Sequence, residues 1–341
     1  MKYLAGISGG LDSTSAVGML IESGHTVIGA TLVMSEHTDV SGAKIAADLL
    51  GIEHHIIDCR DIFEQHVCRD FVDTYMSGCT PNPCVVCNRH VKIETLVRMA
   101  KELGCDKVIT GHYSAVILDE AIGRYSVSRA YDDSKDQSYM LWALTQEQLA
   151  MLHLPLSETF KKELRKVGLE KNLPMATTGE SMDICFIPDG DYAGFIKNAG
   201  VSSPTGDFID QSGTKLGTHR GIIHYTVGQR KGLGISASEP LYVSKINAEN
   251  NTITLAPRAE LMAETMTVRN LNFQALPPTT SGTYDHLLVK IRYKAAPVAA
   301  QVTIEGDTAY VKFSTPVSAI TPGQSAVFYD CNAIAFGGVI S

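Results

Sequence analysis

The feature that most constrains this chain is a short run rich in glycine, serine and aspartate directly behind its first apolar segment. Residues 4–7 are apolar and predict a buried strand, and residues 11–23 have the apolar spacing of a helix. The run Ser-Gly-Gly-Leu-Asp-Ser, residues 8–13, joins the two. Glycines let backbone N–H groups turn inward at such a junction, and a helix N-terminus adds partial positive charge. The junction therefore predicts an oxyanion site, with two serine hydroxyls as donors and Asp12 as a ligand for magnesium.

A glycine pair between a strand and a helix has more than one interpretation. An ordinary turn of this kind binds nothing, so Gly-Gly alone leaves the question open. The complete run is more specific, because it resembles the pyrophosphate loop of enzymes that split ATP between its α- and β-phosphates and adenylate a substrate oxygen. It lacks the Gly-Lys-Ser/Thr ending of P-loop kinases and the third glycine of dinucleotide-binding folds.

Length and composition bound the architecture. A chain of 341 residues is long for one core, so two or three domains are expected, and 44% hydrophobic with 19% charged residues is typical of a globular protein. No apolar stretch is long enough to span a bilayer, so we expect no membrane segment, no signal peptide and a cytoplasmic location. The net charge of −8 argues against indiscriminate nucleic-acid binding but leaves room for a local basic face. Candidate basic clusters are Arg89/His90/Lys92, Lys161/Lys162/Arg165/Lys166, Arg230/Lys231 and Lys290/Arg292/Lys294.

The first half of the chain alternates strand-like and helix-like segments. This alternation predicts a parallel sheet with helices on both faces, in which ligands gather beyond the carboxyl ends of the strands. Because the run 8–13 and the tripeptide Gly111-His112-Tyr113 both follow strands, one nucleotide site is expected to use both. Besides the first pair, the expected strands are 26–32, 53–58 and 107–110, and the expected helices are 42–50 and 93–103.

The second half changes character. Residues 144–173 are charged with helical spacing, whereas after Val201 short β-branched segments alternate with Gly, Ser and Thr. Turn signals at Asn250-Asn251 and at Glu305-Gly306-Asp307 predict hairpins. We therefore expect an α/β chain with three domains: a catalytic parallel-sheet domain over 1–199, a small mostly-β domain over 200–262 and a C-terminal antiparallel β-barrel over 263–341.

Three of the eight cysteines stand out. Cys84 and Cys87 form a Cys-x-x-Cys motif behind Pro-Asn-Pro, so the motif begins in a rigid loop, and Cys185 lies between two apolar residues. A structural zinc site would lack its fourth ligand. Buried core thiols are a second interpretation, most natural for Cys185. Functional thiols that carry a persulfide, exchange disulfides or ligate an iron–sulfur cluster are the third.

A series of short motifs connects these features with a known family. The motifs are residues 6–13, 80–88, 110–113, 135–139, 183–192, 225–235, 292–293 and 321–329. On these motifs the chain resembles the tRNA-specific 2-thiouridylases along nearly its whole length. The resemblance implies an adenine nucleotide alpha hydrolase-like fold for the first domain, ATP and Mg²⁺ as cofactors, and tRNAs of the Lys, Glu and Gln type as substrates. It also implies a sulfur donor, such as a cysteine desulfurase or a sulfur-relay protein.

The resemblance further implies roles for individual residues. Cys185 would carry the sulfur, Cys87 would be its partner thiol, and Asp12 would complete the catalytic set. The ATP-binding residues would be Gly6, Ile7, Ser8, Gly9, Gly10, Leu11, Asp12, Ser13, Leu32 and Gly111. The residues that meet tRNA or its target base would be Asn82, Pro83, Cys84, His112, Lys135, Asp136, Gln137, Arg292, Tyr293 and Gln324.

The implied reaction agrees with what these residue types can do. A uracil carbonyl oxygen is a poor leaving group, and transfer of AMP to O2 of the wobble uridine makes it a good one. A persulfide sulfur on Cys185 then attacks C2, directly or after Cys87 has released it as hydrosulfide. The target base must leave its stack to reach such a site, and a separate barrel that grips the RNA stem would help to extract it.

The chain departs from the family pattern at two positions that matter for chemistry. Cys84 stands where many members have an aspartate, so Cys84, Cys87 and Cys185 become candidate ligands of a 4Fe–4S cluster with one open iron for sulfide. Leu32 stands where the family usually has an ATP-contacting methionine, with Met34 close by. A paralogue that acts on another thiolation substrate is an alternative interpretation of this chain.

Two other classes of function compete with thiolation. An amidating or other adenylating enzyme would share the run 8–13, but it needs neither a thiol pair nor an RNA-gripping barrel. A non-catalytic RNA-binding or iron–sulfur sensor would have no use for a site that releases pyrophosphate.

Overall fold

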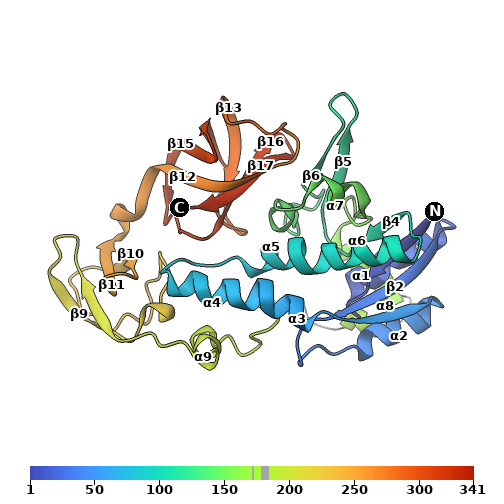
Figure 1. Cartoon of the computed structure of the whole chain (residues 1–341), viewed down its shortest axis with the longest axis horizontal. Helices are drawn as coiled ribbons and strands as arrows, with labels where there is room; N and C mark the ends of the chain where they lie inside the picture. Colours follow the sequence, from blue (N-terminus) through green and yellow to red (C-terminus); the bar gives the residue numbers. More distant parts are fainter. Residues whose placement is uncertain (171–172, 178–183) are drawn as a thin grey trace.

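The first half of the chain folds around a parallel sheet in the order β3-β2-β1-β4-β7. The computed structural model describes residues 1–170, 173–177 and 184–341 (Figure 1). Strand β1 pairs in parallel with both β2 and β4, as the alternating pattern predicts. The strands are β1 (Lys2–Gly6), β2 (Thr26–Val33), β3 (His54–Asp58), β4 (Lys107–Ile109) and β7 (Leu152–His153).

Helices cover both faces of this sheet. Successive residues of β1 point to opposite sides, so Tyr3 and Ala5 join a core with α1 and α2, whereas Leu4 joins a larger core with the helices of residues 60–102. The prediction of a sheet covered on both faces is confirmed. The helices here are α1 (Leu11–Glu22), α2 (Ser41–Leu50), α7 (Gln146–Met151) and α8 (Lys161–Glu170), with the short turns η3 (Ser138–Leu141) and η4 (Pro174–Thr177).

Two long helical runs lie side by side across the middle of the molecule (Figure 1). Each contains one π-turn, and the rings of His66 and His90 from the two π-turns stack with centroids 5.0 Å apart. The sequence predicts that the cysteine motif begins in a rigid loop. In the structure the motif instead lies on a helix, because Pro83 starts α5 and suits its first position. The first run is α3 (Arg60–Phe63), η1 (Glu64–Cys68) and α4 (Arg69–Met76); the second is α5 (Pro83–Cys87), η2 (Asn88–Lys92) and α6 (Ile93–Glu102).

A small mostly-β part follows the helix α9 (Tyr192–Asn198). Its sheet has the order β10-β11-β8-β9, and the hairpin predicted at Asn250-Asn251 joins β10 to β11. Asn251 has a positive φ of 51°, which asparagine tolerates in a tight turn. The elements are β8 (Gly206–Ile209), β9 (Lys215–His219), η5 (Ile222–His224), β10 (Leu241–Asn247), β11 (Thr252–Pro257) and η6 (Arg258–Leu261).

The C-terminal part is a closed antiparallel barrel, as predicted. Strands β12, β15, β14, β13, β16 and β17 follow one another in the sheet, and β17 pairs back to β12. The sequence interpretation missed the hairpin of β5 (Ala115–Asp119) and β6 (Arg124–Ser128), which belongs to the first half of the chain yet joins this sheet where Ser128 pairs with Ala333. The barrel strands are β12 (Met262–Phe273), β13 (Ser281–Lys290), β14 (Val298–Glu305), β15 (Thr308–Ser318), β16 (Ser325–Asp330) and β17 (Ala333–Ile340).

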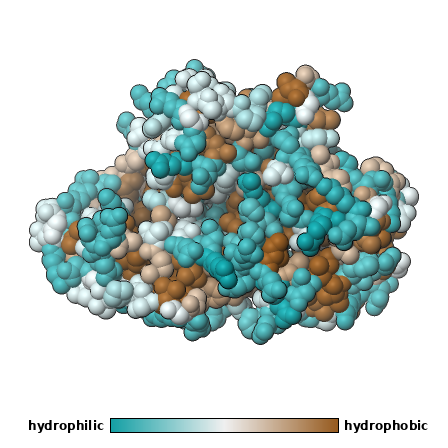
Figure 2. Space-filling model, viewed as in Figure 1, coloured by the Kyte–Doolittle hydropathy of each residue, from teal (hydrophilic) through white to brown (hydrophobic). Residues whose placement is uncertain are grey.

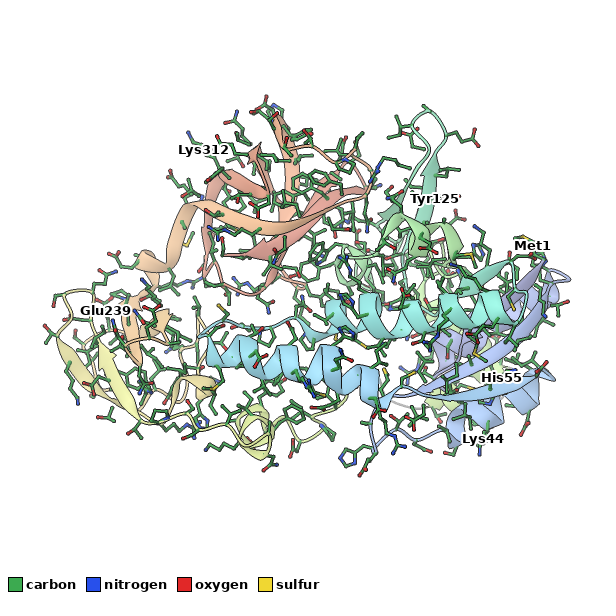
Figure 3. All side chains as sticks on the ribbon, viewed as in Figure 1. Met1, Lys44, His55, Tyr125, Glu239 and Lys312 are labelled. Carbon is green, nitrogen blue, oxygen red and sulfur yellow. The ribbon has the colours of Figure 1, made fainter. Side chains whose placement is uncertain are left out.

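The face of the molecule seen in Figure 2 is mainly polar. Figure 2 shows that hydrophilic side chains predominate on the face in view, with hydrophobic ones scattered among them. Figure 3 places Tyr125 on the projecting hairpin, Lys312 on the barrel and Glu239 at the far end of the small β part. Among the helices that the structure describes, none has the length and apolar character that a bilayer crossing requires.

Candidate functional site

The run 8–13 forms a tight turn between β1 and α1. Gly9 has a φ of +79°, and a Cβ atom there would fall 2.5 Å from the backbone carbon of Gly42, so only glycine fits. Gly10 caps α1, and the hydroxyl oxygens of Ser8 and Ser13 lie 3.2 Å apart. The two hydroxyls thus contact each other within the turn. The backbone N–H groups after Gly10 lie at the start of α1, as an oxyanion site requires.

The second strand end meets this turn directly. A Cβ atom on Gly111 would lie 2.8 Å from the backbone nitrogen of Ser13, so the backbones touch at this point. The structure therefore brings together the two segments that the sequence places at one nucleotide site. The side chains of the predicted ATP-binding residues Ile7 and Leu11 are buried in the core. The backbone N–H and C=O of Ile7 are also hydrogen-bonded, to the Ala30 carbonyl and the Thr31 hydroxyl.

Asp12 has a partner on each carboxylate oxygen. The Tyr113 hydroxyl donates a hydrogen bond of 2.8 Å to Oδ1, and the Lys161 ammonium forms an ion pair with Oδ2. Lys161 also lies over the Tyr113 ring, 5.6 Å from its centroid. The sequence interpretation placed Lys161 only in a basic cluster, because a contact between residues 149 positions apart leaves no local signal.

This carboxylate fits magnesium only together with phosphate oxygens. Mg²⁺ is commonly bound by one or two carboxylates plus the phosphates of a nucleotide. Within residues 1–170, 173–177 and 184–341, no group of three or more His, Cys, Asp or Glu side chains is arranged to hold a metal ion. Asp12 therefore suits a metal that arrives with a nucleotide, rather than one held by the protein alone.

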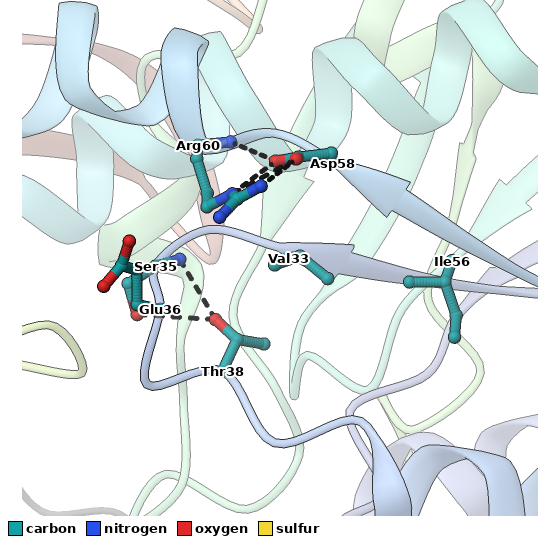
Figure 4. A pocket seen from close by; sticks show the side chains of 7 residues that line it. All are labelled: Val33, Ser35, Glu36, Thr38, Ile56, Asp58 and Arg60. Atoms are coloured by element: carbon teal, nitrogen blue, oxygen red, sulfur yellow. Dashed lines mark hydrogen bonds and ion pairs between the residues drawn. The ribbon is translucent and has the colours of Figure 1, made fainter.

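A cavity of about 450 Å³ opens beyond the carboxyl ends of β2 and β3 (Figure 4). Arg60 donates hydrogen bonds to both oxygens of Asp58, and these lower the pKa of that carboxyl to about 2. Val33 lines the cavity, whereas Leu32, predicted to contact ATP, is buried in the core. The full lining is Val33, Ser35, Glu36, Thr38, Ile56, Asp58 and Arg60.

The three candidate thiols differ in exposure. Cys84 and Cys185 are exposed, whereas Cys87 is 5% exposed and its Sγ lies 3.7 Å from the Sδ of Met34. Burial raises the pKa of the Cys87 thiol to about 11, although the positive charge of Lys92 acts in the opposite direction. As arranged, the three thiols do not form a metal-holding group in the described part of the chain, so we derive no step through an iron–sulfur cluster.

The positive charge of Lys92 acts on the thiols of Cys84 and Cys87 and on His112, which follows Gly111. Burial, and then the charge of Lys92, lowers the pKa of His112 to about 3, so its imidazole is neutral at physiological pH. The His112 Nδ1 lies 2.7 Å from the hydroxyl of Thr110. Cys87 contacts Met34, the residue after β2, and the oxyanion turn follows β1, so both lie at the carboxyl ends of neighbouring parallel strands.

Two predicted tRNA-contacting residues bridge the barrel and the cysteine loop. Gln324 donates from Nε2 to the carbonyl oxygens of Thr80 and Pro81, at 3.2 and 2.9 Å. Asn82 donates to the Ser325 hydroxyl at 3.5 Å. The barrel therefore holds the segment that leads into α5.

The predicted tRNA-contacting residues near the barrel also have partners within the protein. Arg292 donates to the carbonyl of Ser318 at 2.6 Å, while its Nε is buried without a hydrogen-bond partner in the described residues. The ring of Tyr293 lies 6.2 Å from that of Tyr139. An unsatisfied buried donor at Arg292 is a group that a ligand oxygen can satisfy.

The predicted motif 135–137 is held in place by hydrogen bonds to neighbouring residues. Asp136 is 4% exposed, and its carboxylate accepts hydrogen bonds from the amide and hydroxyl of Ser138 and from the amide of Ala130. Gln137 and Tyr113 bond reciprocally, at 2.9 and 3.0 Å. The side chain of Asp136 thus has a structural role that the sequence interpretation did not foresee, and Lys135 beside it is half-buried.

Comparisons with known proteins agree with this three-part architecture. The family profile described as "tRNA methyl transferase HUP domain" matches residues 1–189, "tRNA methyl transferase PRC-barrel domain" matches 193–257, and "Aminomethyltransferase beta-barrel domain" matches 263–340. A solved structure of the U34-tRNA thiolase NcsA from Methanococcus maripaludis, with its 4Fe–4S cluster, has a TM-score of 0.36 and 16% identity over 59% of this chain and 70% of that one. That likeness is too low to bear on this chain's chemistry.

Full-length relatives share one name. A protein named tRNA-specific 2-thiouridylase MnmA from Acetivibrio thermocellus is 40% identical over 99% of both chains. MnmA of Nostoc punctiforme is 40% identical over 99% of this chain and 98% of its own, and MnmA 2 of a Thermoanaerobacter species is 42% identical over 99% and 97%. The chain belongs to the tRNA-specific 2-thiouridylase family.

Proposed function

We propose that this chain transfers sulfur to the 2-position of the wobble uridine (position 34) of tRNA in a reaction that consumes ATP. The observation that carries the proposal is that an oxyanion turn with Asp12 and the thiol of Cys87 lie at the carboxyl ends of neighbouring parallel strands. Relatives named 2-thiouridylases over the full chain support it. We assign residues 1–199 to the catalytic domain, 200–262 to the central domain and 263–341 to the tRNA-binding barrel.

In the first step, O2 of the uridine attacks the α-phosphate of ATP and pyrophosphate leaves. The backbone N–H groups of residues 8–13 bind the phosphates, with Gly6, Leu32 and Gly111 around the nucleotide. Asp12 would hold Mg²⁺, which offsets phosphate charge when bound. Lys161, which pairs with Asp12, is within reach to bind the departing pyrophosphate.

In the second step, a persulfide on Cys185 supplies the sulfur. The Cys87 thiol attacks the Sγ of Cys185 and passes its proton to the outer persulfide sulfur, which forms a Cys87–Cys185 disulfide and releases hydrosulfide. Hydrosulfide adds to C2 of the adenylated uridine and AMP leaves, so sulfur replaces oxygen. A two-electron thiol reductant then restores both cysteines, and a sulfur donor of the cysteine desulfurase or sulfur-relay class reloads Cys185.

The tRNA is proposed to lie across the barrel and the cysteine loop. Its target base would meet Asn82, Pro83, Cys84 and His112, and its stem would meet Lys135, Gln137, Arg292, Tyr293 and Gln324. Asp136 would act by holding the motif in place, because its carboxylate is already hydrogen-bonded. The unsatisfied Nε of Arg292 supports an RNA oxygen as its partner.

A second candidate function comes from the description of the matching family profiles, which speaks of methyl transfer. The thiols beside the oxyanion turn favour sulfur transfer. Purified full-length protein, ATP, Mg²⁺, a sulfur source and unmodified tRNA distinguish the two reactions. Pyrophosphate release that requires tRNA, with sulfur replacing oxygen in the nucleoside mass spectrum, supports the proposal. Pyrophosphate release without tRNA points to a small-molecule adenylating enzyme. In a parallel reaction that also contains a methyl donor such as S-adenosylmethionine, a methyl group added to the tRNA, with no sulfur incorporated, overturns the proposal.

The iron–sulfur alternative has its own test. Anaerobic purification that gives near-stoichiometric iron bound through Cys84, Cys87 and Cys185 would replace the persulfide route with cluster-bound sulfide. Protein without iron that still forms 2-thiouridine supports the persulfide.

A further inference from the structure

Both oxygens of the Asp12 carboxylate are held by side chains from distant parts of the chain. The Tyr113 hydroxyl donates to Oδ1 at 2.8 Å, and the Lys161 ammonium pairs with Oδ2. Tyr113 is 2% exposed and the Lys161 side chain 15%, so packing restricts the movement of both partners. The charge of Lys161 repels a second cation, so Asp12 can bind Mg²⁺ only if Lys161 moves away.

The backbone of Tyr113 is bonded to Gln137, at the end of residues 131–137, which we call the linking segment. The amide of Tyr113 donates to Oε1 of Gln137 at 3.0 Å, and the amide of Gln137 donates to the carbonyl of Tyr113 at 2.9 Å. Tyr113 lies outside β4, which ends at Ile109. The position of the Tyr113 hydroxyl therefore depends on the linking segment rather than on pairing within the parallel sheet.

The linking segment also contacts the residues that lead into α8, the helix that Lys161 begins. The amide of Tyr131 donates to the carbonyl of Ser157 at 2.9 Å. The ring of Tyr131 meets that of Phe160 edge-on, with centroids 5.3 Å apart. Lys161 follows Phe160 directly as the first residue of α8. One short segment is thus connected to the partner of each carboxylate oxygen.

We propose that Tyr113 is a positioning residue that couples the binding of tRNA to the binding of ATP at the oxyanion turn. The inference deepens the proposed function and rests on it, because Lys135 and Gln137 of the linking segment are assigned there to tRNA. When tRNA shifts this segment, Tyr113 and the start of α8 move with it. Asp12 then leaves its pair with Lys161 and becomes able to hold Mg²⁺. Each ligand therefore favours the arrangement that the other needs.

Binding measurements on the full-length protein test this coupling without catalysis. The probe is α,β-methylene-ATP with Mg²⁺, which cannot release pyrophosphate, titrated without tRNA and with saturating unmodified tRNA. We expect tRNA to tighten binding of this analogue about tenfold in the unaltered protein, but less than about twofold in Tyr113→Phe. Without tRNA the variant should bind the analogue as the unaltered protein does, because the ring beneath Lys161 remains. By linkage, the analogue should tighten tRNA binding by the same factor.

The matched control is Tyr3→Phe. Tyr3 is a buried tyrosine of the same core, and its hydroxyl donates to the sulfur of Met1 rather than to Asp12. This variant should keep the effect of tRNA on analogue binding. An effect that persists in Tyr113→Phe, or that is lost equally in Tyr3→Phe, overturns the inference.

A second variant covers the case in which Tyr113→Phe unfolds. Gln137→Met removes the acceptor of the Tyr113 amide and should also reduce the effect of tRNA, and saturating tRNA keeps a weaker tRNA affinity out of the comparison. The two proposals fail differently. A chain that thiolates tRNA, but whose analogue binding does not respond to tRNA, overturns the coupling alone. A chain that binds no tRNA overturns the proposed function as well.

Discussion

The carboxamide of Gln324, in the C-terminal barrel, donates a hydrogen bond of 2.9 Å to the carbonyl oxygen of Pro81, 243 residues earlier in the chain. The same nitrogen donates to Thr80, and the amide of Thr80 donates to the carbonyl of Pro322 at 2.8 Å. A Cβ atom on Gly323 would lie 2.8 Å from the Thr80 oxygen, so the two backbones are in close contact. The barrel therefore positions the segment that begins the thiol-bearing helix, even before any RNA binds.

Replacement of Gln324 by Glu should weaken this contact. A carboxylate would face two carbonyl oxygens with no proton to donate, and the loss of both hydrogen bonds should lower the free energy of unfolding by about 1–3 kcal/mol. Denaturant unfolding measures this change. Alkylation of Cys84 in the absence of tRNA should also speed up relative to Cys105. If both measurements match the unaltered protein, Gln324 does not position the cysteine loop.

Asp12→Asn should abolish adenylation without disturbing the fold. The amide oxygen of the variant can still accept the hydrogen bond from Tyr113. The variant lacks the negative charge that pairs with Lys161 and that would bind magnesium. We expect tRNA-dependent pyrophosphate release to fall at least about a hundredfold. Asp12→Ala should lose it altogether. Near-normal release from Asp12→Asn would contradict a role for this carboxylate in holding the metal.

Cys185→Ser should separate the two half-reactions. The hydroxyl cannot carry a persulfide, so thiolation should disappear while tRNA-dependent pyrophosphate release continues. Nucleoside mass spectrometry and a pyrophosphate assay measure the two steps on the same samples. Cys331→Ser, at an exposed cysteine in the β16–β17 turn, is the matched control and should retain both. Product from Cys185→Ser would mean that sulfur travels by another route.

The buried Cys87 should react only at high pH. Its pKa is raised from 9.0 to about 11, mainly by burial, so at neutral pH the thiol is protonated, and its alkylation should accelerate about tenfold per pH unit up to about 11. The exposed Cys331 gives the comparison on the same peptide digest. A rate profile for Cys87 that levels off near 8.5 would show that its surroundings do not disfavour the thiolate.

The same raised pKa affects stability. The unfolded chain ionises this thiol above about 9, whereas the folded protein keeps it neutral to about 11. The unfolded state therefore binds fewer protons than the folded state between about pH 9 and 11. The contribution of Cys87 to the free energy of unfolding should fall by up to about 1.4 kcal/mol per pH unit as the pH rises through this range. Cys87→Ala should reduce that slope between pH 9 and 11. An unchanged slope would show that Cys87 is not responsible.

Local patterns in the chain carry much of the fold. Alternating apolar segments and the run 8–13 predict the parallel sheet, the first helix and the oxyanion turn, because strand, turn and helix form from residues close together. Turn residues at 250–251 and 305–307 predict hairpins that the structure confirms. The π-turns and the two-residue strand β7 leave no such signal, since one extra residue in a helical turn barely changes the apolar spacing.

The sequence by itself determined the chemistry available to this protein: an oxyanion turn with a carboxylate, and three thiols in a family whose members are named for thiolation. Only the tertiary structure decided which groups act on one another. Asp12 pairs with Lys161, Asp136 is buried and Gln324 holds the cysteine loop by hydrogen bonds. The contacts of Asp12 and Gln324 join residues that are distant in sequence, and the burial of Asp136 depends on the packing around it, neither of which linear spacing encodes.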